Sequence, residues 1–358
     1  MMPSERKPSA GSDGGSAQGR AGEADLVAAA RAGDEAAFAA LTEQYRRQLQ
    51  VHCYRMLGSL EDAEDLVQET FIRAWRNRAS FHGESLYRTW LYQIATNASL
   101  DALRRRRRRV LPPDLGPAGD PRAELPDATD APWLQPYPDR LLEPASPDGS
   151  EPEAMVVERE TIELAFLVAI QALPPRQRAV LILRDVLDWS AAASAWLLET
   201  SVQAINSSLQ RAHVTMRMQL PPERRDWGQV SVATGDEQLL LQRYMEAHER
   251  ADIGGLARLL RDDVRLSMPP MPVWFEGHEA VVAFHEGVFA PEVGHIRGIA
   301  TAANRQPVAA LYVRAPGDAE YRPLALDLLT IDGDAITQIT SFVTPDLFAA
   351  FGLPASFR

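Results

Sequence analysis

Cysteine is almost absent from this sequence, and long apolar runs are missing. Cys53 is the single cysteine among 358 residues, which excludes an internal disulfide and any metal site built from several cysteines. The sequence has no run of about 18 apolar residues that could cross a bilayer, and its N-terminus lacks a basic segment followed by an apolar one. We therefore expect a cytoplasmic protein without a membrane-spanning part, and predict no metal or other cofactor.

Positive charge is in the minority, but it is concentrated. The formal net charge is −12, yet six consecutive arginines run from Arg104 to Arg109. Because local patches rather than the total decide nucleic-acid binding, the acidic average does not exclude DNA as a partner. The length of 358 residues predicts two or three compact units joined by linkers.

The segment from Asp62 to Trp75 has the clearest helical pattern. Upstream, breaks at Gly33 and Gly58 delimit helical stretches, with a separate helix from Leu49 to Leu57, and Ser59 is a candidate N-cap. The buried stripe is predicted to be Ala63, Leu66, Val67, Thr70 and Ala74. The polar face offers Asp62, Asp65, Gln68 and Glu69. Taken alone, such a face is typical of a solvated amphipathic helix.

A second helix is predicted from Leu86 to Arg107, after the loop FHGES. Its core stripe is predicted to be Tyr87, Leu91, Ile94, Ala98 and Ala102, and the neighbouring face Trp90, Gln93, Asn97, Asp101 and Arg104. Aromatic and guanidinium groups together suit single-stranded DNA, since stacking on one base is worth roughly 1–3 kcal/mol. The alternative is that Trp90 is a core aromatic and the arginines are a solvated helix end.

Residues 110–152 are rich in proline and acids, which predicts an extended acidic linker. Residues 153–220 return to helical periodicity and contain a helix-turn-helix pattern. Ser190 caps its first helix, residues 199–201 form the turn, and the second helix buries a stripe of Val202, Ile205, Leu209 and Ala212. The side chains available to DNA are Ser201, Gln203, Asn206, Ser207, Gln210 and Arg211.

These segments, in this order, resemble the extracytoplasmic function group of sigma-70 factors, the bacterial subunits that let RNA polymerase find and open promoters. The resemblance rests on HCYRMLGSLEDAEDLVQETF, FHGES, LPPRQR and NSSLQRA. It implies that the acidic face of the Asp62 helix binds core RNA polymerase and that the helix-turn-helix contacts the −35 promoter element. It also implies −10 contacts by Phe81, Gly83, Arg88, Trp90, Asn97, Arg104 and Arg105. Ala193 and Glu199 depart from the usual glutamate and glycine of that helix-turn-helix, which puts its turn geometry in question.

From residue 236 onward, helical stripes at Leu239, Tyr244 and Ala247 and at Leu256 and Leu259 precede several strands, with a hairpin turn at Asp332-Gly333. This order predicts an α+β cone and resembles the SnoaL-like domain, which some sigma factors carry. A candidate pocket would be lined by Met268, Trp274, Phe275, His278, Asn304, Asp327 and Phe342. The alternative is a packed core.

We therefore expect a multidomain protein with two all-α sigma domains and a C-terminal α+β cone. The expected units are residues 1–24 (tail), 25–109 (region 2), 110–152 (linker), 153–220 (region 4), 221–235 (linker) and 236–358 (SnoaL-like domain). The expected function is non-enzymatic: promoter recognition with core polymerase, with a regulatory third domain. An anti-sigma protein or a small ligand is a further candidate partner. Two alternatives are a ligand-responsive helix-turn-helix regulator and a SnoaL-like enzyme fused to a DNA-binding module.

Overall fold

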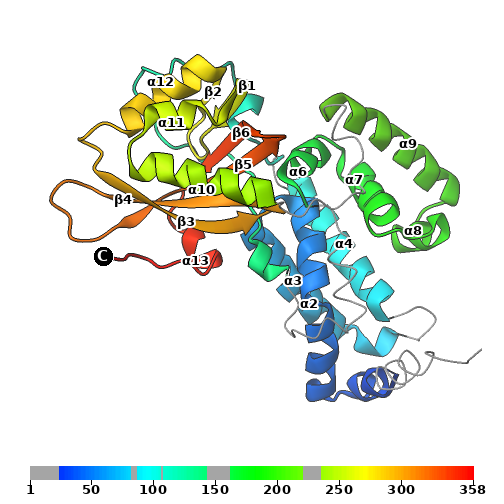
Figure 1. Cartoon of the computed structure of the whole chain (residues 1–358). Helices are drawn as coiled ribbons and strands as arrows, with labels where there is room; N and C mark the ends of the chain where they lie inside the picture. The colour runs from blue at the N-terminus through cyan, green and yellow to red at the C-terminus, as the bar shows by residue number, and fades with distance from the viewer. Residues whose placement is uncertain (1–23, 82–86, 106–107, 143–161, 221–234) are drawn as a thin grey trace, which may run out of the picture.

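The structure, a computed structural model, describes residues 24–81, 87–105, 108–142, 162–220 and 235–358 (Figure 1). We call 24–105 the first helical unit, 108–142 the linker, 162–220 the second helical unit and 235–358 the sheet domain. The sheet domain lies to one side of the two helical units, which pack directly on each other (Figure 1).

The first helical unit begins with a helix at residues 24–32. Its longer elements are α2 (Glu35–Leu57), α3 (Leu60–Arg76), η1 (Arg78–Ser80) and α4 (Tyr87–Arg105). The predicted break before Leu49 was wrong, because the chain between Asp34 and Gly58 contains neither glycine nor proline and forms one helix. The Asp34 side chain caps α2 by accepting hydrogen bonds from the two backbone N–H groups of Ala36 and Ala37, as the break at Gly33 suggested.

Gly58 ends α2 in the left-handed conformation, with φ of 69°. A side chain at this position would meet the linker, because a Cβ would lie 2.5 Å from Cδ1 of Leu134 and 3.2 Å from Nε2 of Gln171. The end of α2 is therefore a point where three segments distant in sequence converge.

The second helical unit is built around the predicted helix-turn-helix. Its elements are α6 (Leu164–Gln171), α7 (Pro175–Leu181), the π-helical turn η4 (Ile182–Val186), α8 (Ala191–Leu197) and α9 (Val202–Gln219). The predicted cap Ser190 is confirmed, because its side chain accepts a hydrogen bond from the backbone N–H of Ala193 at 3.1 Å. Ser201, predicted as part of the turn, caps α9 in the same way by accepting from the N–H of Ala204 at 3.1 Å.

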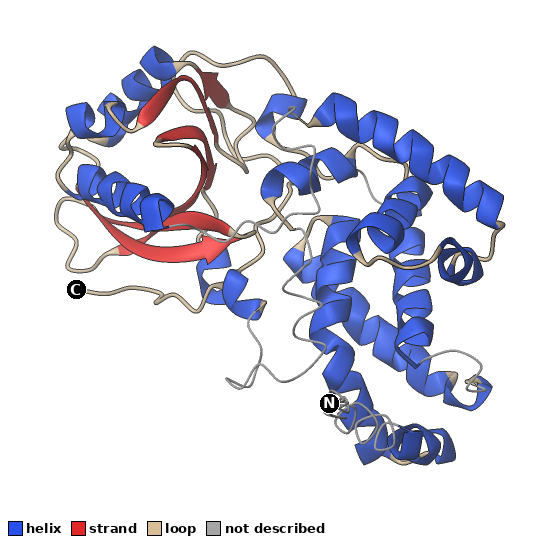
Figure 2. Ribbon diagram, turned by 45° about the vertical axis from the view of Figure 1, so that its right-hand side comes forward, coloured by secondary structure: helices blue, strands red, loops and turns tan. Residues whose placement is uncertain are grey.

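The sheet domain is a curved six-stranded sheet with helices against it (Figure 2). Its helices are α10 (Gly235–Glu249), α11 (Ile253–Ala257), α12 (His278–Val288) and α13 (Leu347–Ala350). Its strands are β1 (Leu260–Ser267), β2 (Trp274–Glu276), β3 (His295–Ala303), β4 (Gln306–Arg314), β5 (Arg322–Asp332) and β6 (Ala335–Phe342). The order is β2-β1-β6-β5-β4-β3, and β1 pairs in parallel with β6 while the other pairs are antiparallel. Leu239, predicted as core, is 46% exposed, whereas Tyr244 and Ala247 are buried.

The linker is extended except for two short turns, η2 (Pro112–Asp114) and η3 (Asp139–Leu141), and it packs against its neighbours. Leu134 and Tyr137 are 1% and 0% exposed. Backbone hydrogen bonds join the N–H of Gly119 to the carbonyl of Trp274 at 2.8 Å, and the N–H of Thr129 to the carbonyl of Pro270 at 3.0 Å. One apolar core runs from the first helical unit through the linker and the second helical unit into one face of the sheet, so the linker is a structural part of the junction.

Candidate nucleic-acid interface

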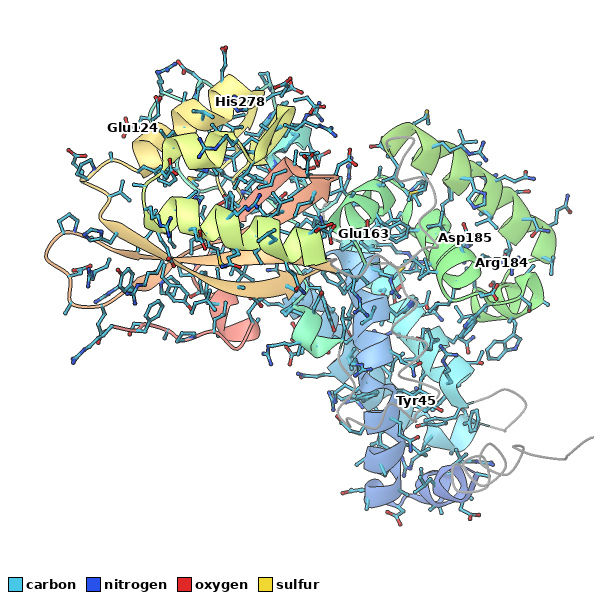
Figure 3. The ribbon with its side chains drawn as sticks, viewed as in Figure 1. Tyr45, Glu124, Glu163, Arg184, Asp185 and His278 are labelled. Atoms are coloured by element: carbon cyan, nitrogen blue, oxygen red, sulfur yellow. The ribbon has the colours of Figure 1, made fainter. Side chains whose placement is uncertain are left out.

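Helix α9 presents the polar face that the sequence predicted. Ser201, Gln203, Asn206, Gln210 and Arg211 are exposed, and Ser207 is half-buried. The opposite side packs through Ile205 and Ala212, while Leu209 is partly buried. Amides and a guanidinium on an exposed recognition helix can reach base edges and phosphates in a major groove. Figure 3 shows Arg184 and Asp185 on the elements beneath this helix.

Two details of the helix-turn-helix differ from the sequence prediction. Val202, predicted in the buried stripe, is 43% exposed at the first position of α9. Glu199 occupies the left-handed region with φ of 50°, so the turn keeps the geometry that usually favours glycine. Glu199 thus replaces the usual glycine without changing the backbone conformation of the turn.

Helix α3 has the predicted buried stripe, with Ala63, Leu66, Val67, Thr70 and Ala74 all buried. Asp65, Gln68 and Glu69 are exposed on the outer side. Asp62 differs, because its carboxylate pairs with the Arg109 guanidinium at 2.5 Å and its side chain is only 14% exposed. On this face, Asp65 and Glu69 are therefore exposed, whereas Asp62 forms an ion pair with the start of the linker.

Helix α4 carries an aromatic cluster at its start. Phe81 is 6% exposed, and its ring centroid lies 5.3 Å from that of Trp90 and 5.5 Å from that of Tyr87. The alternative reading of Trp90 as a packing residue is thus partly correct, since Trp90 is half-buried within this cluster. Gly83 lies outside the described residues.

The other predicted −10 residues of α4 differ in their surroundings. Arg88 donates a hydrogen bond to Oε1 of Gln48 at 3.0 Å, Asn97 is half-buried, and Arg104 and Arg105 are exposed at the helix end. Arg104 also pairs with Asp101 at 2.7 Å. The exposed positive charge of this surface is therefore concentrated at the end of α4.

The two helical units meet at the C-terminal end of α2. The last carbonyls of a helix lack partners within it, and a cation there is favoured by the helix dipole. Arg178 of α7 supplies a hydrogen-bond donor and a positive charge at this helix end, because its guanidinium donates to the carbonyl of Met56. The same guanidinium also donates to Oε1 of Gln171 at 2.6 Å. Arg178 is 2% exposed, and burial lowers its pKa to about 9. Neither its burial nor its role follows from the motif LPPRQR.

Asn304 joins three segments at the turn between β3 and β4. Its Oδ1 accepts a hydrogen bond from the backbone N–H of Tyr137 at 2.8 Å, and its Nδ2 donates to the Tyr54 hydroxyl at 2.9 Å and to the carbonyl of Ile162 at 2.6 Å. The residue is 0% exposed and has a φ of 56°, which asparagine tolerates in tight turns. The predicted role of Asn304 in a pocket was wrong, because its side chain joins the sheet domain to the linker and the helical units.

The remaining candidate pocket residues do not gather around one cavity. Met268 and Phe275 are packed in the core between the sheet and its helices, whereas Phe342 belongs to the core shared with the helical units. His278 lies on α12, far from that junction (Figure 3), and its Nε2 is 2.9 Å from the carbonyl of Ala257. Trp274 lines a separate cleft outside the cone.

Asp327 belongs to a buried polar cluster inside the sheet domain. The Tyr244 hydroxyl donates to its Oδ2 at 2.8 Å, and the ring of His248 lies 4.4 Å from Tyr244 and 5.5 Å from His285. Burial raises the pKa of Asp327 and lowers the pKa of each histidine to about 4. The two histidines are therefore uncharged near neutral pH, and burial disfavours the charged form of the Asp327 carboxyl.

The described part of the chain contains no helix with both the length and the apolar character needed to cross a bilayer. Within the same residues, His, Cys, Asp and Glu side chains form no group of three or more that could hold a metal ion.

Comparison with known families accounts for this order of units. The Sigma-70 region 2 model matches residues 41–109, the Sigma-70 region 4 model residues 163–216, and the SnoaL-like domain model residues 241–339. The chain is 45% identical over 322 residues to the ECF RNA polymerase sigma factor SigG of Mycobacterium tuberculosis, covering 89% of this chain and 84% of that protein. It is 31% identical over 190 residues to SigW of Bacillus subtilis, covering 52% and 91%. The crystal structure of the sigma factor SigJ of M. tuberculosis has the same fold, with a TM-score of 0.55 at 21% identity over 88% of this chain and 99% of that one.

Proposed function

The chain belongs to the extracytoplasmic function family of RNA polymerase sigma factors, and from this premise we propose what each of its surfaces does. As a sigma factor it binds core RNA polymerase and promoter DNA and initiates transcription, and it carries a fused SnoaL-like domain. We infer a cytoplasmic location, because its partner RNA polymerase acts there.

We assign polymerase binding to the exposed acidic part of α3, −10 recognition to α4 and −35 recognition to α9. The exposure of Asp65 and Glu69 supports the first assignment. The half-buried Trp90 beside exposed arginines supports the second, and the polar outer face of α9 from Gln203 to Arg211 supports the third. Asp62, predicted together with Asp65 and Glu69, pairs with Arg109 in this arrangement, so we assign the polymerase contact to Asp65 and Glu69 first.

We further propose that the sheet domain regulates initiation by favouring a closed arrangement of the two helical units. The −10 and −35 elements are separated by ~25 base pairs, or about 85 Å at ~3.4 Å per pair. In contrast, α4 and α8 are in direct contact, and the rings of Tyr92 and Trp189 are 5.3 Å apart. A helix of the length of α9 spans only about 27 Å, so the closed arrangement cannot contact both elements at once. Binding to a promoter therefore requires the units to separate.

The single observation that carries this proposal is the Asn304 contact. A turn of the sheet domain hydrogen-bonds to the first helical unit, to the linker and to Ile162, two residues before α6 of the second helical unit. Opening must break these bonds and expose the shared core, so the sheet domain opposes opening. We assign no catalytic role to the sheet domain, since Tyr244 and Asp327 are buried and hydrogen-bonded to each other.

Run-off transcription with core polymerase tests the proposal. Full-length protein and its Asn304→Gly variant are compared on the same promoter at equal concentrations. We expect more transcript from the variant, because it opens more easily while α3, α4 and α9 are unchanged. Equal transcript from both proteins over the whole concentration range would contradict a regulatory role of this contact. A point variant is preferable to removal of the domain, which would expose the shared apolar core.

A further inference from the structure

A cleft of about 1040 Å³ lies where the sheet domain, the linker and the second helical unit meet. Its floor is the outward face of β1, which carries Arg261, Asp263, Arg265 and Ser267. These four residues share a face because alternate side chains of a strand point to opposite sides. Figure 3 shows Glu163, another lining residue, at this junction.

The opposite wall of the cleft is apolar. It is formed by Leu164 and Val168 of α6, Met218 and Leu220 at the end of α9, and Leu111 of the linker. Met218 is 72% exposed, and methionine adapts its shape readily to a bound group. A cleft with one apolar wall and one polar floor suits an amphipathic ligand, and its volume is at the upper end for small-molecule sites.

The charges around the cleft favour a cation. Its floor contains two guanidinium groups, of Arg261 and Arg265, and three carboxylates, of Asp263, Glu276 and Asp332, so one carboxylate is in excess. Asp114, which also lines the cleft, is paired with Arg108 of the linker at 3.2 Å. Both guanidinium groups already pair with lining carboxylates: Arg261 with Asp263 and Asp332, and Arg265 with Glu276 at 2.6 Å. The excess of negative charge attracts a positive ligand and repels an anion.

Two further groups point to a ligand in this place. Ser267 is 2% exposed, and its hydroxyl has no hydrogen-bond partner among the residues that the structure describes, although such groups normally have one. Trp274 lines the floor next to it in the β1–β2 pair, with the Arg265 guanidinium 5.8 Å from its ring centroid. The ring is thus already near a cation, and its face could also attract a cationic ligand.

We propose that this cleft binds an amphipathic organic cation, with its apolar body against α6 and α9 and its positive group among the carboxylates of the floor. Since the cleft exists only while the three units are together, the ligand stabilises the closed arrangement. At a concentration 100 times its Kd it would favour that arrangement about 100-fold. This consequence rests on the proposed regulation of initiation, whereas the binding itself does not.

The test uses full-length protein and rhodamine 6G, a cationic amphipathic dye, with fluorescence anisotropy as the readout. We expect saturable binding, and at least tenfold weaker binding of the anionic dye 8-anilinonaphthalene-1-sulfonate. The double variant Glu276→Gln, Asp332→Asn should weaken rhodamine binding at least tenfold, and Ser267→Ala severalfold. Glu292→Gln, an exposed acidic position that does not line the cleft, is the matched control and should bind as the unchanged protein does.

Three results would overturn the site: no saturable binding of rhodamine 6G, equal binding of the anionic dye, or unchanged binding by the double variant. Asp332 and Glu276 have side chains that are 69% and 47% exposed, so their neutralisation leaves the fold intact, which a melting curve verifies. Run-off transcription with and without the dye tests the coupling separately. Binding without any change in transcript would retain the site and refute its regulatory effect.

Discussion

The Asn304→Gly variant tests how strongly the sheet domain holds the helical units. Asn304 has a φ of 56°, a conformation that glycine adopts freely, so the substitution removes the side chain without straining the turn. Three hydrogen bonds are lost, but the Tyr54 hydroxyl keeps its bond to the carbonyl of Gln135 at 2.8 Å. The backbone N–H of Tyr137 and the carbonyl of Ile162 lose the partners that Asn304 supplied.

The expected cost follows from these two groups. A buried polar group without a partner costs about 1–3 kcal/mol, so the junction should weaken by about 2–6 kcal/mol. A water molecule that fills the space of the amide would bring the cost to the lower end. Even about 2 kcal/mol changes the ratio of closed to open molecules by a factor of about 30.

Hydrogen exchange measured by mass spectrometry is the direct assay, because the amide of Tyr137 is itself bonded to Asn304. Exchange at this amide should become at least tenfold faster in the variant. Asp334→Gly, an exposed position in the turn between β5 and β6 of the same sheet, is the matched control and should leave it unchanged. An unaltered exchange rate at Tyr137 in the variant would refute the role of Asn304 as the connection between the domains.

Three other perturbations address the remaining parts of the structure. Gly58→Ala should lower the melting temperature, because φ at this position is 69° and the added Cβ would lie 2.5 Å from Cδ1 of Leu134 in the linker. Gly116→Ala is the control and should leave the melting temperature unchanged, because its Cβ would meet no atom within 4 Å. Acid should destabilise the sheet domain. Folding lowers the pKa of His248 and of His285 from 6.5 to about 4, so both histidines bind protons more readily in the unfolded chain. Stability should therefore fall as the pH drops from 6.5 to about 4 and change less below that, as a chemical denaturation series would reveal. The raised pKa of Asp327 acts in the opposite sense, because this carboxyl binds a proton more readily when folded. Arg211→Ala should weaken promoter binding, either by ~1–3 kcal/mol on selected sequences or equally on all with a smaller salt dependence, and unchanged binding on every promoter would remove Arg211 from recognition.

Short-range patterns in the sequence were sufficient for most of the secondary structure. The stripe from Ala63 to Ala74, the caps Ser59 and Ser190 and the strands of the sheet domain were predicted because a helical or strand period and a cap are each encoded within a few residues. The same reasoning failed for Val202 and Leu239, which have the right period but are 43% and 46% exposed, because a period does not specify which segment covers a position.

The tertiary structure alone decided which polar residues meet across the domains. Asn304 and Tyr137 are 167 positions apart, and Asp62 and Arg109 are 47 apart, so no local spacing relates them. The candidate pocket failed for a related reason: both faces of the sheet are covered, one by its own helices and the other by the helical units, so apolar alternation could not distinguish the inside of a cone from a domain interface. Periodicity thus determined the elements and short motifs the family resemblance, whereas the closed junction and its cleft depend on the packing of segments far apart in the chain.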